Sequence, residues 1–185
     1  MKPEVDRAAL LQLLRDRSLR RGDFVLASGA RSSYYIDARL TTMAGAGQLL
    51  IGRLGLAAMD ERGWAPVSVG GLTLGADPVA YAIAHAAATA QRSLDAFTVR
   101  KQAKEHGTGR RIEGNLREGD AVVVVEDVIT SGGSALNAKQ AVEEAGATVL
   151  GVLAIVDREQ GGTEKIRDAG CDVIALATAG ELLAG

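Results

Sequence analysis

The chain has 185 residues, of which 47% are hydrophobic, 24% charged and 3% aromatic. This length favours one domain whose core is built mostly from Ala, Val, Leu and Ile. A net charge of -2 argues against a dedicated nucleic-acid-binding protein, although it leaves room for a local basic loop. A single cysteine excludes an internal disulfide. We find no basic-then-apolar leader and no long uncharged apolar run, so we expect a cytoplasmic protein.

The N-terminal third reads as a helix, a pair of strands and a second helix. Apolar residues amid charges predict an amphipathic helix over 3–20. Residues 24–39 predict two short strands around a Ser-Gly turn. A helical pattern covers 41–62, and its four glycines indicate close packing against a neighbour.

The rest of the chain alternates between strand and helix. Such alternation is typical of an α/β fold with a mostly parallel sheet flanked by helices. We therefore predict one domain, 1–185, in which 1–40 form a small hood and 41–185 the α/β core. The expected strands are 66–71, 95–99, 122–126, 148–157 and 171–176, and the expected helices 77–91, 134–145 and 162–169.

The segment 122–134, VVVVEDVITSGGS, carries the strongest chemical signal. Four valines suit a central strand that is buried on both faces, and parallel sheets bind ligands at the carboxyl ends of their strands. Glu126 and Asp127 are expected at that edge. The small residues from Thr130 to Ser134 offer backbone N–H groups at the start of a helix, which suits a phosphate. The simpler alternative is a turn and a helix N-cap at Ser131 or Ser134.

This segment resembles the signature with which type I phosphoribosyltransferases bind phosphoribosyl pyrophosphate. The resemblance implies that fold, with its N-terminal hood. It implies that Glu126 and Asp127 bind the ribose hydroxyls, that Asp127 also serves catalysis, and that the following loop holds the 5-phosphate. The implied loop residues are Val128, Ile129, Thr130, Ser131, Gly132, Gly133 and Ser134.

A basic loop at 100–111, RKQAKEHGTGRR, follows the strand 95–99. Such a charge run is often only a solvated surface. Here it resembles, residue for residue, the catalytic loop of the orotate phosphoribosyltransferases. The resemblance implies that Lys104 is the main catalytic cation, that His106 and Arg100 support it, and that Lys101 contacts the diphosphate. In that family the loop enters the neighbouring subunit's site, which implies a homodimer.

Two further segments bear on the acceptor base. The stretch 24–39 resembles the family's hood, which implies that the pyrimidine meets Tyr34 and Tyr35, although both could equally fill a core strand. By the same resemblance Arg158 faces the orotate carboxylate, whereas an isolated arginine is usually a surface residue. Thr130 is placed to contact the base as well as the phosphoribosyl group.

The sequence departs from the family's commonest pattern at two positions. Ala27 and Gly75 stand where many members have lysine, which removes positive charge near the diphosphate. Asp77 either binds a metal or water or caps the helix that follows it. We read His85 as a packed or partly exposed residue and Cys171 as a buried apolar one, and neither as a ligand.

Together the motifs imply an enzyme of pyrimidine biosynthesis that transfers the phosphoribosyl group to orotate, releasing pyrophosphate. Mg²⁺ is the expected cofactor, held mainly by the substrate's oxygens rather than by any certain protein ligand. The alternatives are a phosphoribosyltransferase for another base, or a regulator that senses phosphoribosyl pyrophosphate. We expect no nucleic-acid or membrane partner.

Overall fold

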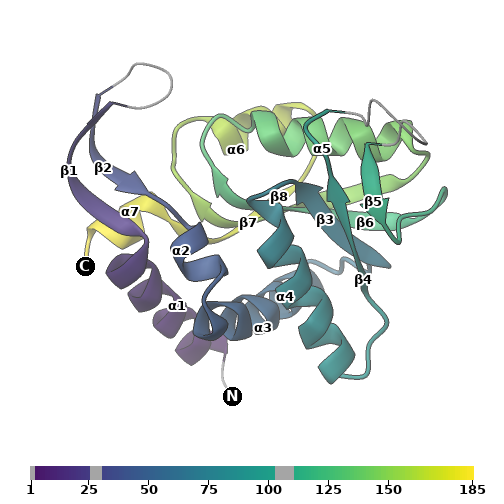
Figure 1. Ribbon diagram of the computed structural model, residues 1–185, viewed down its shortest axis with the longest axis horizontal. Helices are drawn as coiled ribbons and strands as arrows, with labels where there is room; N and C mark the ends of the chain where they lie inside the picture. The colour runs from purple at the N-terminus through teal and green to yellow at the C-terminus, as the bar shows by residue number, and fades with distance from the viewer. Residues whose placement is uncertain (1–2, 26–30, 103–110) are drawn as a thin grey trace.

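The computed structural model describes residues 3–25, 31–102 and 111–185 and is shown in Figure 1. Its first half contains α1 (Pro3–Arg17), β1 (Leu19–Val25), β2 (Arg31–Ile36), α2 (Arg39–Thr42), α3 (Gly45–Glu61), β3 (Ser68–Leu72) and α4 (Ala76–Thr89). Its second half contains β4 (Asp95–Val99), β5 (Ile112–Gly114), β6 (Ala121–Ile129), α5 (Gly133–Glu144), β7 (Thr148–Asp157), α6 (Gly162–Asp168), β8 (Val173–Thr178) and α7 (Ala179–Leu183).

A six-stranded sheet in the order β5-β4-β3-β6-β7-β8 forms the centre of the described residues. Its strands are parallel except for β5, which runs antiparallel to β4 at the edge. The predicted α/β fold with a mostly parallel sheet is therefore confirmed. β6 lies between β3 and β7, as the four valines indicated.

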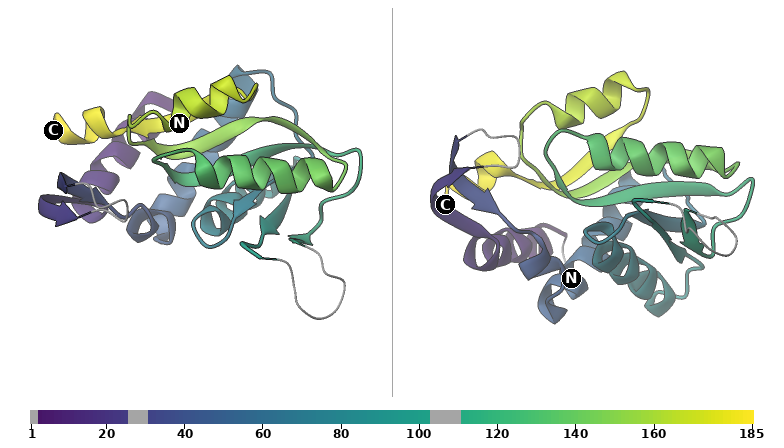
Figure 2. Two further views of the ribbon diagram at one scale, coloured as in Figure 1. Left: turned by 90° about the horizontal axis from the view of Figure 1, so that it is seen from above. Right: turned by 45° about the horizontal axis from the view of Figure 1, so that its top comes forward.

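The sheet separates two apolar cores, because successive side chains of a strand point to opposite faces. Val123 and Val125 join the core beneath α1, α3 and α4, whereas Val122 and Val124 join the core beneath α5 and α6. Figure 2 shows these two layers of helices on either side of the sheet. Since all four valines are fully buried, β6 is held rigidly from both faces.

A separate antiparallel hairpin, β1 and β2, stands beside the sheet next to α7 (Figure 1). Arginine contacts tie the C-terminal helix to α1 and the hairpin. Arg7 pairs with Glu181 at 2.6 Å, Arg15 donates to the Glu181 carbonyl at 2.8 Å, and Arg21 donates to the Leu183 carbonyl at 2.7 Å. The C-terminal helix therefore anchors the hood hairpin to the main body.

The structure corrects the expected elements in three places. The first helix ends at Arg17, so residues 19 and 20 belong to β1. The helix expected over 41–62 is divided into α2 and α3, because Ala44 is extended (φ −85°, ψ 138°). Two short elements, β5 and α7, were not predicted. Within the described ranges, every helix is too short or too polar to cross a lipid bilayer.

Candidate active site

The end of β6 forms the floor of the candidate site. β3 pairs with β6 only as far as Val124, so the last residues of β6 extend beyond its neighbour on that side. Glu126 and Asp127 lie in this extension. The strand continues to Ile129, so Asp127 lies inside it and not just after it, as the expected strand 122–126 suggested. The extension exposes their carboxyl groups to a cleft at the carboxyl edge of the sheet, where α/β proteins bind their ligands.

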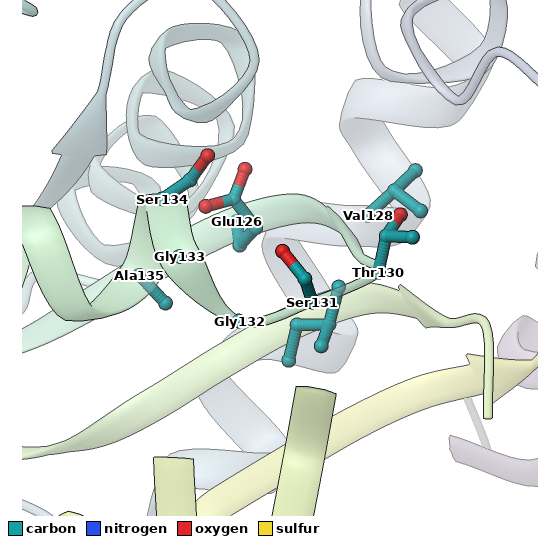
Figure 3. A pocket seen from close by; sticks show the side chains of 9 residues that line it. Glu126, Val128, Thr130, Ser131, Gly132, Gly133, Ser134 and Ala135 are labelled. Carbon is teal, nitrogen blue, oxygen red and sulfur yellow. The ribbon is translucent and has the colours of Figure 1, made fainter. Parts of the chain in front are cut away.

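The loop between β6 and α5 encloses a pocket of about 90 Å³. Gly132, in the left-handed conformation with φ 73°, is the N-cap of α5, and no side chain caps the helix there. The serine cap considered from the sequence is therefore wrong, and the first N–H groups of α5 remain available to an anion. Figure 3 shows the hydroxyls of Ser131 and Ser134 directed to the same space as the Glu126 carboxylate. The pocket is lined by Glu126, Val128, Ile129, Thr130, Ser131, Gly132, Gly133, Ser134 and Ala135.

Glu126 is a buried carboxyl group with one oxygen that lacks a partner. Its side chain is 6% exposed, and its Oε2 has no hydrogen-bond partner in the described structure. Burial, followed by the neighbouring charge of Asp127, raises the pKa of Glu126 to about 9. A buried acceptor without a donor is costly, so the site favours a ligand that brings hydroxyl groups to this carboxylate.

A wider cleft of about 340 Å³ adjoins the pocket between β6 and α5, which we call the phosphate pocket. It shares Glu126, Val128, Thr130 and Ser134 with that pocket, so the two spaces lie side by side. A volume of this size is near the lower end of small-molecule sites. The other lining residues come from the hood side, the 72–75 turn, the basic loop, β6 and the turn after β7: Tyr35, Ile36, Asp37, Ala38, Arg39, Leu72, Thr73, Leu74, Gly75, Lys101, Asp127 and Arg158.

Arg158 is buried in the wall of this cleft, with 6% of its surface exposed. Its Nε and Nη2 lack hydrogen-bond partners among the described residues, and its Cζ lies 5.2 Å from the centre of the Tyr34 ring. An unpaired guanidinium stacked on an aromatic ring is prepared to receive a planar anion. Tyr34 thus supports Arg158 from beneath, while Tyr35 lines the cleft itself.

The Arg158 turn and the phosphate loop are packed against each other. Arg158 donates its backbone N–H to the Ile129 carbonyl at 2.9 Å, and Thr163 donates to Asp157 at 2.6 Å. A Cβ on Gly162 would lie 2.5 Å from the Thr130 carbonyl oxygen and 2.8 Å from the Gly132 nitrogen. The absence of a side chain at Gly162 therefore lets the two turns touch.

Of the four residues expected to act in the basic loop, the structure describes Arg100 and Lys101. Lys101 lines the cleft, whereas Arg100 is directed to β5, where its Nε donates to Glu113 at 3.1 Å. Lys104 and His106 lie outside the described residues, as does Ala27 of the hood. Their expected roles stay predictions.

Asp77 does not cap α4, because its side chain is bonded to two threonines. The N-cap of α4 is Gly75, and Asp77 lies in the first turn. Its two carboxylate oxygens accept hydrogen bonds from Thr73 at 2.7 Å and from Thr98 at 2.9 Å. Asp77 therefore joins the cleft-lining 72–75 turn to the end of β4. Within the described ranges, no three His, Cys, Asp or Glu side chains gather as a metal site.

Two cleft residues were missed by sequence reasoning, Asp37 and Arg39. They form a pair in which Arg39 donates to Asp37 through Nε at 2.9 Å and through Nη2 at 3.1 Å. This hydrogen bond is the main cause that lowers the pKa of Asp37. Asp37 ends the hood segment whose resemblance was noted, but no role was assigned to it. The Asp-x-Arg spacing by itself resembles any surface ion pair.

Comparisons with known proteins agree with this geometry. The model of the phosphoribosyl transferase domain family matches residues 51–177. The orotate phosphoribosyltransferase of Streptomyces avermitilis is 50% identical over 167 residues, covering 90% of each chain, and that of Aquifex aeolicus is 44% identical over 182 residues, covering 97% of this chain and 98% of its own. A crystal structure of Mycobacterium tuberculosis orotate phosphoribosyltransferase in complex with 5-phospho-alpha-D-ribosyl 1-diphosphate matches with a TM-score of 0.79 and 39% identity, covering 96% of this chain and 92% of that one.

Proposed function

Since this chain belongs to the orotate phosphoribosyltransferases of the phosphoribosyl transferase domain family, we propose how its cleft carries out their reaction. The enzyme transfers the 5-phosphoribosyl group of phosphoribosyl pyrophosphate to N1 of orotate, giving orotidine 5′-phosphate and pyrophosphate. The observation that carries the proposal is the adjacency of two spaces. A phosphate-sized pocket at the start of α5 shares four lining residues with a cleft that contains a buried arginine, Arg158, whose Nε and Nη2 lack partners among the described residues.

The phosphoribosyl group occupies the pocket and the floor beside it. The backbone N–H groups at the start of α5 and the hydroxyls of Ser131 and Ser134 bind the 5-phosphate. Glu126 and Asp127 then accept hydrogen bonds from the ribose hydroxyls. These bonds supply the donors that the buried Glu126 lacks in the free protein.

Orotate lies against the Arg158 wall of the cleft. The Arg158 guanidinium forms a bidentate pair with the orotate carboxylate, and the ring of Tyr34 holds that guanidinium in place. Tyr35 and Thr130 border the same space, and Thr130 also borders the phosphate pocket. Thr130 is therefore suited to contact the phosphoribosyl group and the base together.

Orotate that has lost its N1 proton attacks C1 through N1, and the bond between C1 and the diphosphate oxygen breaks, so that the bonding electrons leave with pyrophosphate. Negative charge grows on the departing diphosphate and positive charge on the ribose ring, so cations over the leaving group lower the barrier. We assign this role to Lys101, which lines the cleft, and to Lys104 and His106 of the same loop, with Arg100 in support. Closure of this loop would also exclude water from the reacting centre.

We also propose Mg²⁺ as the cofactor. Glu126 and Asp127 are the carboxylates proposed to bind the ribose hydroxyls, and the oxygens of a bound substrate would supply ligands to the ion. The described residues contain no three-ligand cluster of their own. A bound Mg²⁺ would neutralise charge on the diphosphate. The residues that would hold the liganded substrate are Glu126 and Asp127, through the ribose hydroxyls.

We propose that the enzyme is a homodimer whose two copies meet at an apolar groove between α3 and α4. The groove has a volume of about 900 Å³, and Leu49 and Tyr81 in it are 55% and 53% exposed. Tyr81 is also within 3.3 Å of Thr98, two residues before the basic loop begins. An interface here would bring the loop of one copy near the other, and isologous contact makes the exchange reciprocal.

We further propose a cytoplasmic location, since the phosphorylated substrates of this reaction are kept inside cells by their charge.

The reaction itself is tested by incubating the protein with phosphoribosyl pyrophosphate, Mg²⁺ and a panel of orotate, uracil, hypoxanthine and adenine. Consumption of orotate with release of orotidine 5′-phosphate supports the proposal. Transfer to another base, or binding of phosphoribosyl pyrophosphate without transfer to any base, would overturn it.

A further inference from the structure

Gly75 lines the cleft, and by the resemblance described above it stands where many members of the family have lysine. A Cβ on Gly75 would lie 2.7 Å from Cγ and 2.9 Å from Oδ2 of Asp127. A side chain at this position would therefore press on the Asp127 carboxylate as it is placed here. With glycine at position 75, this side of the cleft gains no cation from the 72–75 turn.

The described lining of the cleft contains three cations, Arg39, Lys101 and Arg158. Arg158 is buried against Tyr34, on the side assigned to the base. Lys101 belongs to the basic loop, whose function we have already described. Arg39, the third cation, lies on the hood side of the cleft, and neither of these two roles applies to it.

Arg39 is the first residue of the short helix α2, which follows β2 (Figure 1). It is one of the residues that line the cleft. Its side chain is 45% exposed, so it is accessible to a ligand. Asp37 accepts from its Nε, its Nη2 and also its backbone N–H, the last at 3.2 Å. These three bonds fix the direction of the guanidinium in the free protein.

The pair with Asp37 leaves donors of Arg39 available. A guanidinium carries five N–H donors in one plane, and Asp37 uses the side formed by Nε and Nη2. The side that contains Nη1 can pair with a second anion. The charge of Asp127 also acts on Arg39, since it adds to the effect of Asp37 in raising the pKa of the guanidinium. Arg39 therefore lies within electrostatic range of the acidic pair at the floor of the site.

We propose that Arg39 is a further substrate-binding residue, whose guanidinium, held in place by Asp37, contacts the diphosphate of phosphoribosyl pyrophosphate from the hood side. It supplies the charge that a lysine at position 75 would otherwise give. Arginine suits this role because its planar donors match phosphate oxygens in pairs. The inference rests on the orotate phosphoribosyltransferase reaction proposed above and adds a residue to it.

The test compares four ligands in the forward and reverse reactions of the Arg39→Ala enzyme. Only phosphoribosyl pyrophosphate and pyrophosphate carry the diphosphate. Their KM values should rise about tenfold or more, as expected for the loss of a charge-assisted contact. The KM values of orotate and orotidine 5′-phosphate should change by less than about twofold, since neither contains a diphosphate. Arg39→Lys, which keeps the charge but loses the planar fork, should give an intermediate rise.

Arg62→Ala is the matched control. Arg62 forms an ion pair with Asp172, and its side chain is 46% exposed, close to the value for Arg39, but it lines neither the cleft nor the phosphate pocket. Its KM values should match those of the wild-type enzyme. Asp37→Asn removes the charge of the positioning residue but leaves Arg39, so it should raise the pyrophosphate KM less than Arg39→Ala does.

Two results would overturn the inference. If Arg39→Ala leaves both diphosphate KM values unchanged, Arg39 does not contact the diphosphate. If all four KM values rise together, the pair with Asp37 only supports the hood. Failure of the proposed reaction is separate from both outcomes, because it would appear as lack of orotate transfer by the wild-type enzyme.

Discussion

The hydroxyl of Thr98 donates a hydrogen bond to Asp77 at 2.9 Å. This bond joins the end of strand β4 to the first turn of α4. Because that hydroxyl has one proton, Tyr81 must be the donor in its own 3.3 Å contact with Thr98. Thr73, from the turn that lines the cleft, donates to the other oxygen of Asp77. One half-buried carboxylate thus connects the cleft wall to the groove between α3 and α4.

We predict that Asp77→Ala loosens the 72–75 turn. Loss of two hydrogen bonds to a half-buried carboxylate should lower the free energy of unfolding by about 1–3 kcal/mol. The KM for phosphoribosyl pyrophosphate should rise more than the KM for orotate, because Gly75 of this turn lies against Asp127. Chemical denaturation and steady-state kinetics measure both effects. Asp95→Ala, at an exposed position on β4, is the control. Unchanged stability would show that the two threonines find other partners.

Glu126 gives a prediction about pH. Its pKa of about 9 in the folded protein exceeds the ordinary value of 4.5, so protonation favours the folded state. Stability from this group is complete below about pH 4.5 and is lost as the pH rises through 9. Glu126→Gln cannot ionise, so we expect its ligand-free Tm to exceed that of the wild type at pH 8–9 but not at pH 5.

Thermal unfolding at these pH values, without ligand, tests that prediction. Glu61→Gln, an exposed residue at the end of α3, should follow the wild-type profile and serves as the control. The Glu126→Gln variant should also bind phosphoribosyl pyrophosphate more weakly than wild type, since an amide cannot accept from both ribose hydroxyls as a carboxylate does. Parallel pH profiles for variant and wild type would mean that Glu126 ionises normally.

Arg158 is expected to select the acceptor by its carboxylate. Arg158→Ala should weaken the use of orotate, measured as kcat/KM, by about 2–3 kcal/mol, the scale for a hydrogen bond between charged groups. Any residual transfer to uracil, which lacks the carboxylate, should change little. Tyr34→Leu should have a smaller effect of about 0.5–1 kcal/mol, since it removes only the ring beneath the guanidinium. Equal losses for orotate and uracil would instead assign Arg158 to the fold of the cleft.

The shared site of a homodimer is tested by mixing two inactive proteins. Lys104→Ala lacks the expected loop cation and should lower kcat by about 10²–10³, while Asp127→Ala lacks a floor carboxylate. In a mixed dimer the intact loop of one copy meets the intact Asp127 of the other. Random pairing then restores about one quarter of the sites.

If Lys104 acts within its own chain, every site keeps one lesion and the mixture stays inactive. Exchange of subunits has to be confirmed independently, for example with differently tagged copies. Leu49→Asp, at the exposed groove between α3 and α4, should shift the protein towards monomer in sedimentation. A fully dimeric Leu49→Asp protein would exclude this groove as the interface.

Much of the fold was readable from the sequence because its elements have a clear apolar period. The valines of β6, the apolar run of β7 and the alanine-rich α4 each predicted their element and its burial. β5 has three residues and no period, so only its pairing with β4 defines it. The break between α2 and α3 depends on the backbone of Ala44, which no pattern of side chains signals.

The parts of the candidate site that are formed by residues adjacent in the sequence could be predicted. The parts that depend on contacts between distant segments could not. The phosphate loop is one continuous segment, so its residues were identified together. Arg158 stacks on Tyr34, which is more than a hundred residues away in the sequence. The partners of Asp77 and the approach of Gly75 to Asp127 are likewise tertiary contacts. Local sequence carries no information about such contacts.

The close packing of Gly162 on the phosphate loop has a consequence for the choice of ligands. Under the proposed assignment, the N-terminus of α5 binds one anion of the product and Arg158 binds the other. Because the two turns touch and share the bond from Arg158 to Ile129, the distance between these anion sites is built into the apoprotein. The cleft therefore selects ligands by the distance between a sugar phosphate and a ring carboxylate. A pyrimidine acid with its carboxylate at another ring position could not reach both anion sites, even though its charge is correct.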